Sequence, residues 1–403
     1  MKTEKLINKT VAYGLNVSGG KVNSLRVNED MKTVIRVYSD GKIGVAGRIG
    51  EGDDGELLKD AQSGLSQNIA YPCNLGGDKK RSVNRVKHPV PAGEFVKTMK
   101  KLLARLNAEY PDFIFSNKIN MEEFSCTYEN SENTSYSYSS DYLAIVLVIQ
   151  HKQSSNIMDL AYDAVQDYYD EDKVVSDIGK LLSVFEKHVG LDANLPVIIG
   201  KEVIYYALNH LVAELYVSGA SLFKDKLGSK VFDERVNIFT YRGEDSKQCI
   251  PFFDSEGVTV EGDKFHFAKD GVLCGLATYK RSAANFNLPL SGGGYAEFDG
   301  VPSPSVMGVE VGKTSDSLKE LVKGKAIYVY QTSGGDMTPD GTLGIPVQVA
   351  YLYEDGKLIG RLPEFTMNAN IFDLLGKDFI GAAANDVFGY REETVVVGKF
   401  KIM

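Results

Sequence analysis

TVIRVYSDGKIGVA, residues 33–46, is the stretch of sequence from which the fold class follows. Two strand-like runs, Thr33–Tyr38 and Ile43–Ala46, flank the dipeptide Asp40-Gly41. Glycine accepts the positive φ that a type I′ turn requires, so Asp-Gly between two such runs is a strong short-range hairpin signal. We therefore expect two antiparallel strands joined at Asp40-Gly41.

The C-terminal half repeats this pattern twice, with an Asp-Gly pair between two apolar runs each time. The turns are Asp270-Gly271 and Asp355-Gly356, and the runs are 265–268 with 272–279, and 347–353 with 357–362. Further strands are predicted in 123–151, around a polar and Tyr-rich centre, and at 197–199 and 394–397. Most of the predicted strands beyond residue 195 are therefore antiparallel.

Helices are predicted where apolar residues recur at three- and four-residue spacings. The predicted ranges are 57–65, 93–108, 156–169, 173–188, 201–217 and 371–375. Residues 72–92 are polar and contain Gly76-Gly77, Pro89 and Pro91, which predicts a loop. The positive charges in that loop, from Lys79 to His88, are expected to form a solvated face.

Strands are grouped after helices and joined in hairpins rather than in βαβ units, which indicates an α+β protein in both halves. A length of 403 residues favours two or three domains. We place the boundary at the turn before the strand at 197–199. Residues 1–194 are then an N-terminal α+β domain with α/β sandwich-like layers, and residues 195–403 are a mostly antiparallel β domain with an entry helix.

The composition excludes several classes of function. Lys and Arg number 45 against 54 Asp and Glu, which gives a net charge of −9. Because nucleic-acid surfaces neutralise phosphates with clustered positive charge, we expect no direct nucleic-acid partner. The hydrophobic content of 43% is ordinary for a globular protein and large enough for a core without disulfides or metal.

Localisation follows from the absence of targeting signals. The longest clean apolar run, Leu143–Ile149, reads as a buried strand, because a membrane-spanning helix needs ~20 residues. The N-terminal MKTEKLINKT lacks an apolar signal region. The cysteines (Cys73, Cys126, Cys249 and Cys274) form no CxxC pair, which indicates reduced, mostly buried thiols. We expect a cytoplasmic protein with no membrane partner.

Local motifs for catalysis are weak. No two histidines lie within five residues of each other, whereas a zinc site on one element needs ligands three to five residues apart. His210 and Glu214 stand one turn apart on the predicted helix 201–217, but two ligands do not make a site. The Gly-rich stretches 291–294 and 333–336 match no phosphate-binding pattern and are expected to be flexible loops edging a cleft.

Several stretches, taken in chain order, resemble one family. The resembling stretches are Leu25–Val27 with the hairpin to Ala46, Asn130–Gln150, Pro196–Ile199 with the following helix, Ser221–Gly228, Phe253–Val258 and Lys269–Leu273. The most specific are FDSEGV at 253–258 and DGVL at 270–273. They are similar to the F-D-x-E-G-V and D-G-x-L signatures of the TldD/PmbA family, the so-called modulators of DNA gyrase. The signature residues are Phe253, Asp254, Glu256, Gly257, Asp270 and Gly271.

This resemblance implies a two-subunit cytoplasmic peptidase. One subunit, TldD, carries an HExxxH zinc helix and a C-terminal cysteine ligand, whereas PmbA, also called TldE, lacks them. The helix in question falls on Glu202–Tyr216 here. If His210 is the second histidine, Tyr205 and Tyr206 replace the first histidine and the glutamate. If His210 is the first, leucines replace the other two, and no cysteine lies beyond Cys274.

The resemblance is therefore to the PmbA/TldE-like branch, with no catalytic residues, no metal and no cofactor of its own. Zinc is expected only in a TldD-like partner. The favoured hypothesis is a non-catalytic subunit that helps to enclose unfolded peptide. One alternative is a self-contained homodimeric peptide-binding protein of the same fold. Another is a metal enzyme whose site assembles from distant residues such as His210, Glu214 and His266. The gyrase link is a family name that the net charge does not support.

Overall fold

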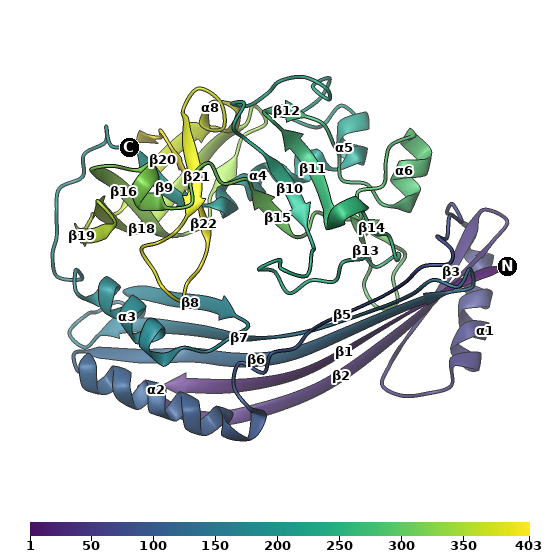
Figure 1. The fold of residues 1–403 in the computed structure, drawn as a ribbon, viewed down its shortest axis with the longest axis horizontal. Coiled ribbons are helices and arrows are strands. Elements are labelled where there is room, and N and C mark those ends of the chain that lie inside the picture. The colour runs from purple at the N-terminus through teal and green to yellow at the C-terminus, as the bar shows by residue number, and fades with distance from the viewer.

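Long antiparallel strands form the base of the N-terminal half (Figure 1). The computed structural model describes residues 1–403. An eight-stranded sheet has the order β4-β3-β2-β1-β6-β7-β5, with β8 paired to β7, and only the β5–β7 pair is parallel. The strands are β1 (Lys2–Ser18), β2 (Lys21–Ser39), β3 (Lys42–Ile49), β4 (Ile69–Ala70), β5 (Lys80–Arg85), β6 (Phe113–Asn130), β7 (Ser135–His151) and β8 (Leu160–Gln166).

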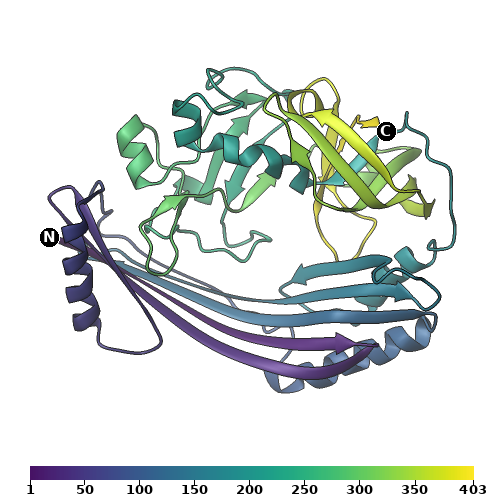
Figure 2. The ribbon, with the colours of Figure 1, turned by 180° about the vertical axis from the view of Figure 1, so that it is seen from behind.

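Helices stand at the two ends of this sheet. α1 (Asp54–Gly64) packs at the end that holds the N-terminus, and α2 (Phe95–Glu109) and α3 (Glu171–Leu182) lie at the opposite end (Figures 1 and 2). The apolar side of α2 is fully buried, as its three- and four-residue spacing predicts. The predicted helices over 57–65, 93–108 and 173–188 are therefore confirmed, although α3 ends at Leu182.

The C-terminal half contains two larger sheets that lie above the N-terminal strands in Figure 1. One has nine strands in the order β21-β22-β9-β16-β18-β20-β23, with β17 and β19 also paired to β18, and the other is β12-β11-β10-β15. The nine strands are β9 (Val197–Gly200), β16 (Lys325–Thr332), β17 (Asp336–Met337), β18 (Thr342–Glu354), β19 (Lys357–Arg361), β20 (Phe365–Asn370), β21 (Phe379–Ala384), β22 (Thr394–Gly398) and β23 (Lys401–Ile402).

The smaller sheet and the short elements complete this half. They are β10 (Ile238–Tyr241), β11 (Lys264–Lys269), β12 (Val272–Leu273), β15 (Val309–Val311), the pair β13 (Gly294–Tyr295) and β14 (Ser303–Pro304), and helices α4 (Tyr205–Leu208), α5 (Ala213–Val217), α6 (Lys280–Phe286), α7 (Leu318–Leu321) and α8 (Ile371–Leu374). The mixture of helices with mostly antiparallel sheets confirms the predicted α+β class.

All three Asp-Gly hairpins form as predicted. The Asp40-Gly41, Asp270-Gly271 and Asp355-Gly356 turns each have two consecutive residues at positive φ, from 47° to 89°. This is the backbone that a type I′ turn requires, and glycine adopts it without a Cβ penalty. The local signal therefore fixes the register of β2–β3, β11–β12 and β18–β19.

One hydrophobic core joins the two halves. It holds 40 buried residues and includes Leu102 and Ile178 from the N-terminal helices together with Ile198, Tyr328 and Val397 from the nine-stranded sheet. The opposite face of that sheet packs into a second core of 33 buried residues with α8 and β10. The nine-stranded sheet is thus covered on both faces, and its strands read as almost continuous apolar runs.

Two predictions about local structure are wrong, each because strand pairing overrides it. Residues 156–169 were expected to be a helix, but Leu160–Gln166 form β8, which pairs with Leu143–Ile149 and alternates buried and outward residues. Residues 72–92 were expected to be a loop, but Lys80–Arg85 form β5 beside β7. In both cases an already formed strand supplies backbone partners that outweigh the local preference.

The expected entry helix over 201–217 is broken into short pieces. Val212 is extended, with φ −67° and ψ 129°, between a 3₁₀ turn and α5. The backbone on each side of Val212 pairs with Ala277. The Ala277 N–H donates to the Leu211 carbonyl at 2.7 Å, and the Ala213 N–H donates to the Ala277 carbonyl at 3.0 Å. This pairing explains the break, because the residue between the two bonds must be extended.

Asp177 on α3 links the two halves through three backbone N–H groups. It is fully buried and accepts from Gly389 at 2.7 Å, Tyr390 at 2.7 Å and Arg391 at 3.1 Å. Asp177→Asn replaces one acceptor oxygen with an amide donor that faces these N–H groups. We expect a loss of about 2 kcal/mol in the free energy of unfolding, measured by urea denaturation.

Asp172→Asn is the control for this prediction, since Asp172 lies on the same helix with its side chain 86% exposed. Its effect should stay within about 0.5 kcal/mol. Equal stabilities for the two variants would contradict the role given to Asp177.

Candidate functional site

A cleft of about 830 Å³ opens where β8 of the N-terminal half faces the nine-stranded sheet. Asp163 on β8 is the one lining residue from the N-terminal half, and the others belong to the C-terminal half. The polar and aromatic lining residues are Asp163, Glu202, Tyr205, Tyr206, Asn209, His210, Tyr330, Thr332, Asp336, Arg391 and Glu393. The cleft is large enough to bury several residues of an extended peptide.

Three of the residues singled out in the sequence lie together in this cleft. Tyr205, Tyr206 and His210 line it, with Glu202 and Asn209 on the same side of the helical turns at 201–211. Their spacing of three and four residues puts them on one helical face. The opposite face is buried in the second core, which fixes the orientation of the segment.

Glu214 does not belong to the cleft. The extended backbone at Val212 separates it from His210, so the two are not neighbours on one helical face, contrary to the prediction. One carboxylate oxygen of Glu214 is buried with no hydrogen-bond partner. The more distant metal hypothesis also fails, because no three His, Cys, Asp or Glu side chains, His266 included, stand close enough to hold a metal ion.

The chemistry of the donor set does not suit zinc either. The His210 Nδ1 accepts a hydrogen bond from the Leu222 backbone N–H at 3.1 Å. A neutral imidazole that accepts at Nδ1 carries its proton on Nε2, which leaves no free lone pair for a metal. Burial lowers the pKa of His210, which favours this neutral form. The phenols of Tyr205 and Tyr206 are not zinc ligands of the usual kind.

The phenols on the cleft wall stay protonated. Burial, followed by the charge of Glu202, raises the pKa of Tyr205 to about 12. Burial and then the charge of Asp336 raise the pKa of Tyr206. These shifts also show that each tyrosine lies near a carboxylate, so the wall combines aromatic faces with negative charge.

At the base of the cleft, one arginine is held between carboxylates. Arg391 lies 3.4 Å from Glu393 and 3.9 Å from Asp163, and its guanidinium stands 4.8 Å above the ring of Tyr330. The Arg391 backbone is fixed by Asp177, as described above. The base of the cleft therefore depends on the contact between the two halves.

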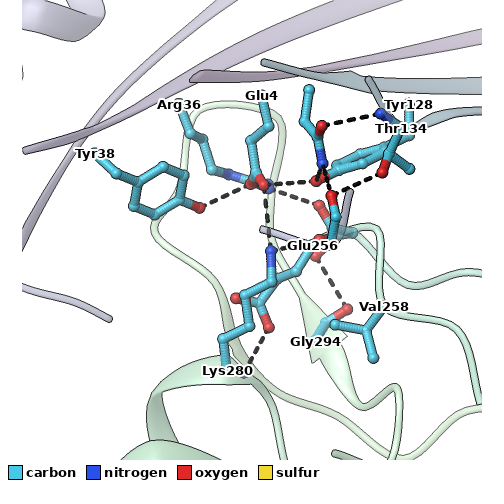
Figure 3. Close-up of polar contacts among 12 residues, drawn as sticks. Glu4, Arg36, Tyr38, Tyr128, Thr134, Glu256, Val258, Lys280 and Gly294 are labelled. Carbon is cyan, nitrogen blue, oxygen red and sulfur yellow. Dashed lines mark hydrogen bonds and ion pairs between the residues drawn. The ribbon is translucent and has the colours of Figure 1, made fainter. Parts of the chain in front are cut away.

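Glu256 of the family signature lies elsewhere, in a buried polar network between the first strands and the C-terminal half (Figure 3). At its centre the Glu4 carboxylate is 2% exposed. It accepts from Arg36 and Tyr38 at 2.8 Å and from Tyr128 at 2.9 Å, and lies 3.3 Å from the Lys280 ammonium. Burial alone would raise the pKa of Glu4, but the charges of Lys280 and Arg36 outweigh it and keep that pKa low.

The cations of this network also grip the signature loop. Arg36 donates to the Ser255 carbonyl and Lys280 donates to the Glu256 carbonyl, both at 2.6 Å. The Glu256 carboxylate in turn accepts from the Tyr71 hydroxyl at 2.6 Å and from the Lys280 backbone N–H at 2.9 Å. The FDSEGV motif is therefore a fastening between the two halves.

The same motif shapes its own loop. Asp254 accepts from the backbone N–H groups of Glu256 and Val258 at 2.9 Å and of Gly294 at 2.8 Å. Gly257 has a φ of 68°, and a Cβ there would stand 2.2 Å from the ring of Tyr128. Only glycine fits this position.

The remaining signature residues are structural as well. Phe253 packs against Tyr136 with ring centroids 5.4 Å apart, and Asp270-Gly271 forms the β11–β12 turn. None of the signature residues lines the cleft. The structure thus separates the sequence candidates into two groups. Tyr205, Tyr206 and His210 form the cleft group. The FDSEGV residues, which join the two halves, form the fastening group.

Three further predictions need correction. The positive residues at 79–88 are not simply solvated: Arg81 forms a bidentate pair with Asp263 at 2.7 Å, and Arg85 donates to the Ser246 and Gln248 carbonyls. They therefore connect β5 to the C-terminal half. All four cysteines are free, but only one is buried. The loop 291–294 is buried against Asp254 and does not edge the cleft, whereas Asp336 of the loop 333–336 lines it.

Sequence reasoning missed the residues that complete both groups. Glu4, Arg36 and Lys280 belong to no local motif. Lys280, for example, meets Glu4 only through a contact that spans more than 200 residues of the sequence. Asp336 could have been found, since its Gly-rich loop was already expected to edge a cleft. Arg391 could not, since its place depends on Asp177.

Ionisation of Glu256 is expected to make stability depend on pH. Burial, followed by the charge of Asp254, raises the pKa of Glu256 to about 7 from an ordinary 4.5. The folded chain then binds this proton more tightly than the unfolded chain does, so the free energy of unfolding should fall as pH rises through this window. The pKa of Glu4 is lowered, so the protonation of Glu4 affects stability only at pH values below this range.

Glu256→Gln removes the titrating group. The stability of this variant relative to wild type should improve by about 1–3 kcal/mol as pH rises from about 5 to about 7.5. Urea denaturation at several pH values measures the difference. Parallel pH dependences in the two proteins would show that Glu256 has no raised pKa.

Residues 193–400 match the family model described as the PmbA/TldA metallopeptidase C-terminal domain. A metalloprotease from Methanocaldococcus jannaschii is 28% identical over 178 residues, which is 43% of this chain and 39% of that protein. One from Archaeoglobus fulgidus is 25% identical over 199 residues, 49% of this chain and 45% of that protein. The chain thus matches less than half the length of either relative.

Three solved structures share the fold over the whole chain. TldE from Thermococcus kodakarensis has a TM-score of 0.80 at 15% identity and is covered to 96%. Proteins proposed to modulate DNA gyrase, from Thermotoga maritima and Bacteroides thetaiotaomicron, have TM-scores of 0.77 and 0.76 at 15% and 13% identity, with 95% and 94% covered. At these identities, the likeness establishes the fold.

Proposed function

The chain belongs to the PmbA/TldD metallopeptidase family, and from this premise we propose that it is the non-catalytic, metal-free subunit of a two-chain peptidase. Its partner would be a TldD-like chain that carries the zinc. The role of this subunit is to help enclose an unfolded peptide in the cleft between its two halves.

The observation that carries this proposal is the donor set on the cleft-facing turns at 201–211. Tyr205 and Tyr206 stand there with His210, whose Nδ1 is already engaged by a backbone N–H. A zinc peptidase needs three protein ligands and a general base at its metal. With the Nδ1 of His210 engaged, the Glu202 carboxylate is the one group of that kind left on these turns, which falls short of three ligands and a base, so bond cleavage is assigned to the partner.

The shape of the cleft supports the second half of the proposal. It is lined by strands, turns and loops of the C-terminal half and by Asp163 on β8, and its wall has exposed phenol surface and carboxylates. Tyrosine offers large contact area at low cost in conformational entropy, which suits the binding of extended peptides of varied sequence.

Pairing and digestion test the proposal. The chain is expressed alone and together with a TldD-like chain of the HExxxH type, and each sample is passed over a size-exclusion column with light scattering. We expect co-elution, and cleavage of an unfolded peptide only when the HExxxH chain is present. The matched control is the same mixture with the HExxxH glutamate replaced by glutamine.

Two results would contradict the proposal. Peptide cleavage by this chain alone, abolished by a chelator, would make it a peptidase in its own right. A stable homodimer that does not bind the HExxxH chain, yet still binds unfolded peptide, would instead support the self-contained peptide-binding alternative.

A further inference from the structure

The first half of β2 leaves one side of the long sheet open. β1 pairs with β2 along nearly its whole length, whereas β3 pairs only with residues 32–39 on the other side. Residues 21–31, called the open edge below, therefore have no strand beside them on that side. The Met31 carbonyl accepts from the Gly50 N–H at 2.8 Å, and no further backbone hydrogen bond from outside the β1–β2 hairpin reaches this segment.

The open edge presents free backbone groups and apolar side chains. Successive residues of a strand direct their N–H and C=O groups to alternate sides. Because the Met31 carbonyl faces the open side, the groups of Glu29, Val27 and Leu25 face it as well. Residues 23–29 are all exposed, so no helix or loop covers them, and Leu25 and Val27 are 46% and 51% exposed. Such an edge favours the addition of another strand.

The two ends of the open edge have opposite charge. Lys21 and Arg26 lie at one end, and Glu29 and Asp30 lie at the other. Asp30 pairs with Lys32 at 3.2 Å, whereas the other three have no ion pair within the chain. Opposite charges on facing residues stabilise strand pairing, and like charges destabilise it. The open edge is therefore complementary to an antiparallel copy of itself.

A hollow beside the acidic end adds a second complementary feature. It has a volume of about 530 Å³ and includes Met31 and Gly50 of the edge. Its charged lining residues are Glu29, Asp30, Glu51, Glu123 and Lys9. The basic end finishes in the Gly19-Gly20 turn, and nothing lies within 4 Å of the position that a Cβ of Gly19 would take. In an antiparallel pair this slim turn lies next to the hollow of the other copy, with Lys21 close to its carboxylates.

Symmetry and charge determine the register. A two-fold axis perpendicular to the sheet leaves every side chain on its own face, so one central residue must face its own copy. Full overlap of residues 21–30 puts this centre at Leu25 or Arg26. Two facing arginines repel each other, whereas two facing leucines remove apolar surface from water. Leu25 is therefore the central residue, and its outward N–H and C=O groups bond to those of its copy.

We propose that two copies of this chain pair antiparallel along the open edge of β2, with Leu25 of one copy facing Leu25 of the other. The two long sheets then become continuous across the two-fold axis. In Figures 1 and 2, β2 follows the lower side of the sheet, away from the C-terminal half. No residue of the open edge lines the cleft, so this inference does not depend on the proposed function.

Light scattering of the full chain alone, over a concentration series, and cysteine cross-linking test the proposal. We expect the mass of a dimer. Leu25→Cys, in a Cys274→Ser background that removes the exposed native thiol, should form a disulfide-linked dimer under mild oxidation. Facing residues have Cα atoms about 5.5 Å apart, within the range that a disulfide spans. Asn28→Cys is the matched control, because Asn28 is also exposed but lies roughly 20 Å from its own copy in this register.

Charge reversal tests the register without cysteine. Lys21→Glu and Glu29→Lys each place like charges opposite each other twice per dimer. Each variant alone should therefore dimerise about five- to tenfold more weakly than wild type. An equimolar mixture of the two variants should regain the wild-type affinity, since opposite charges then face each other at both ends. A folding defect in either variant would not be rescued by mixing.

A chain that stays monomeric throughout the series would overturn the proposal. A dimer that Leu25→Cys does not cross-link, or that Asn28→Cys cross-links equally well, would overturn it too. Hydrogen exchange at Leu25 and Val27 tests the other occupant. Protection that appears only after an HExxxH chain is added would assign the open edge to that chain and overturn self-pairing. Peptide digestion by the mixture with the HExxxH chain tests the proposed function separately from all of these results.

Discussion

Arg36→Met is expected to lower the free energy of unfolding by about 3–5 kcal/mol, the largest effect of any single substitution considered for this chain. Arg36 is 1% exposed and donates to the Glu4 carboxylate and to the Ser255 carbonyl. Its removal leaves a buried carboxylate with one cation fewer and a buried carbonyl with no donor. Both deficits are costly, because burial prevents water from replacing the lost partner.

The matched control is Arg26→Met on the same strand, since Arg26 is exposed and bonds only to Asn28. Its effect should stay within about 0.5 kcal/mol. The double variant Arg36→Met with Glu4→Gln should lose less stability than the sum of the two single changes, because the buried charge goes with its partner. Chemical denaturation of the four proteins measures the coupling. Additive losses would mean that Arg36 and Glu4 do not depend on each other.

Gly257→Ala should be nearly as damaging, with a loss of about 3 kcal/mol. The residue has a φ of 68°, and a Cβ would stand 2.2 Å from the Tyr128 ring, which itself is held by Glu4. The ring cannot move away without breaking that hydrogen bond. The strain of the backbone and the clash with the ring therefore add.

Gly262→Ala separates the two causes. Gly262 has a similar φ of 61°, but nothing lies within 4 Å of the position that its Cβ would take. This control should lose only about 1 kcal/mol, the cost of the backbone alone. Thermal unfolding of both variants measures the difference. Equal losses would show that the ring of Tyr128 yields, and that the signature loop is less tightly fastened than its contacts imply.

The sequence predicts those parts of the fold that local chemistry controls. The Asp-Gly turns at 40–41, 270–271 and 355–356 form because only two residues and their φ angles decide them. It does not predict β8 or the break at Val212. There a distant strand or residue supplies the backbone partner, and no local pattern records that partner.

The candidate site divides in the same way. Tyr205, Tyr206 and His210 could be grouped from the sequence, because they share one helical face. Asp163 faces that group from β8, which the sequence pattern predicts as a helix, so the sequence does not predict the acidic character of the cleft. The FDSEGV motif was recognisable as a signature, but its contact with the first strands depends on Arg36 and Lys280, which are far from it or from Glu4 in the sequence.

The two groups of residues differ in what they do in the structure. The fastening group holds the first strands against the C-terminal half, whereas Arg391 at the cleft is held by Asp177 and lies 3.9 Å from Asp163. The cleft group lacks a zinc donor set. The signature residues therefore stabilise the contact between the two halves, and none of them lines the cleft.

Zinc quantification on the purified chain, after incubation with zinc and removal of the unbound ion, tests the central claim most directly. The account predicts no stoichiometric zinc, because the Nδ1 of His210 is engaged and its neighbours are Tyr205 and Tyr206. His210→Ala should then leave the trace of bound metal unchanged. One zinc ion retained per chain, and lost in His210→Ala, would contradict the account and place a metal centre in the cleft.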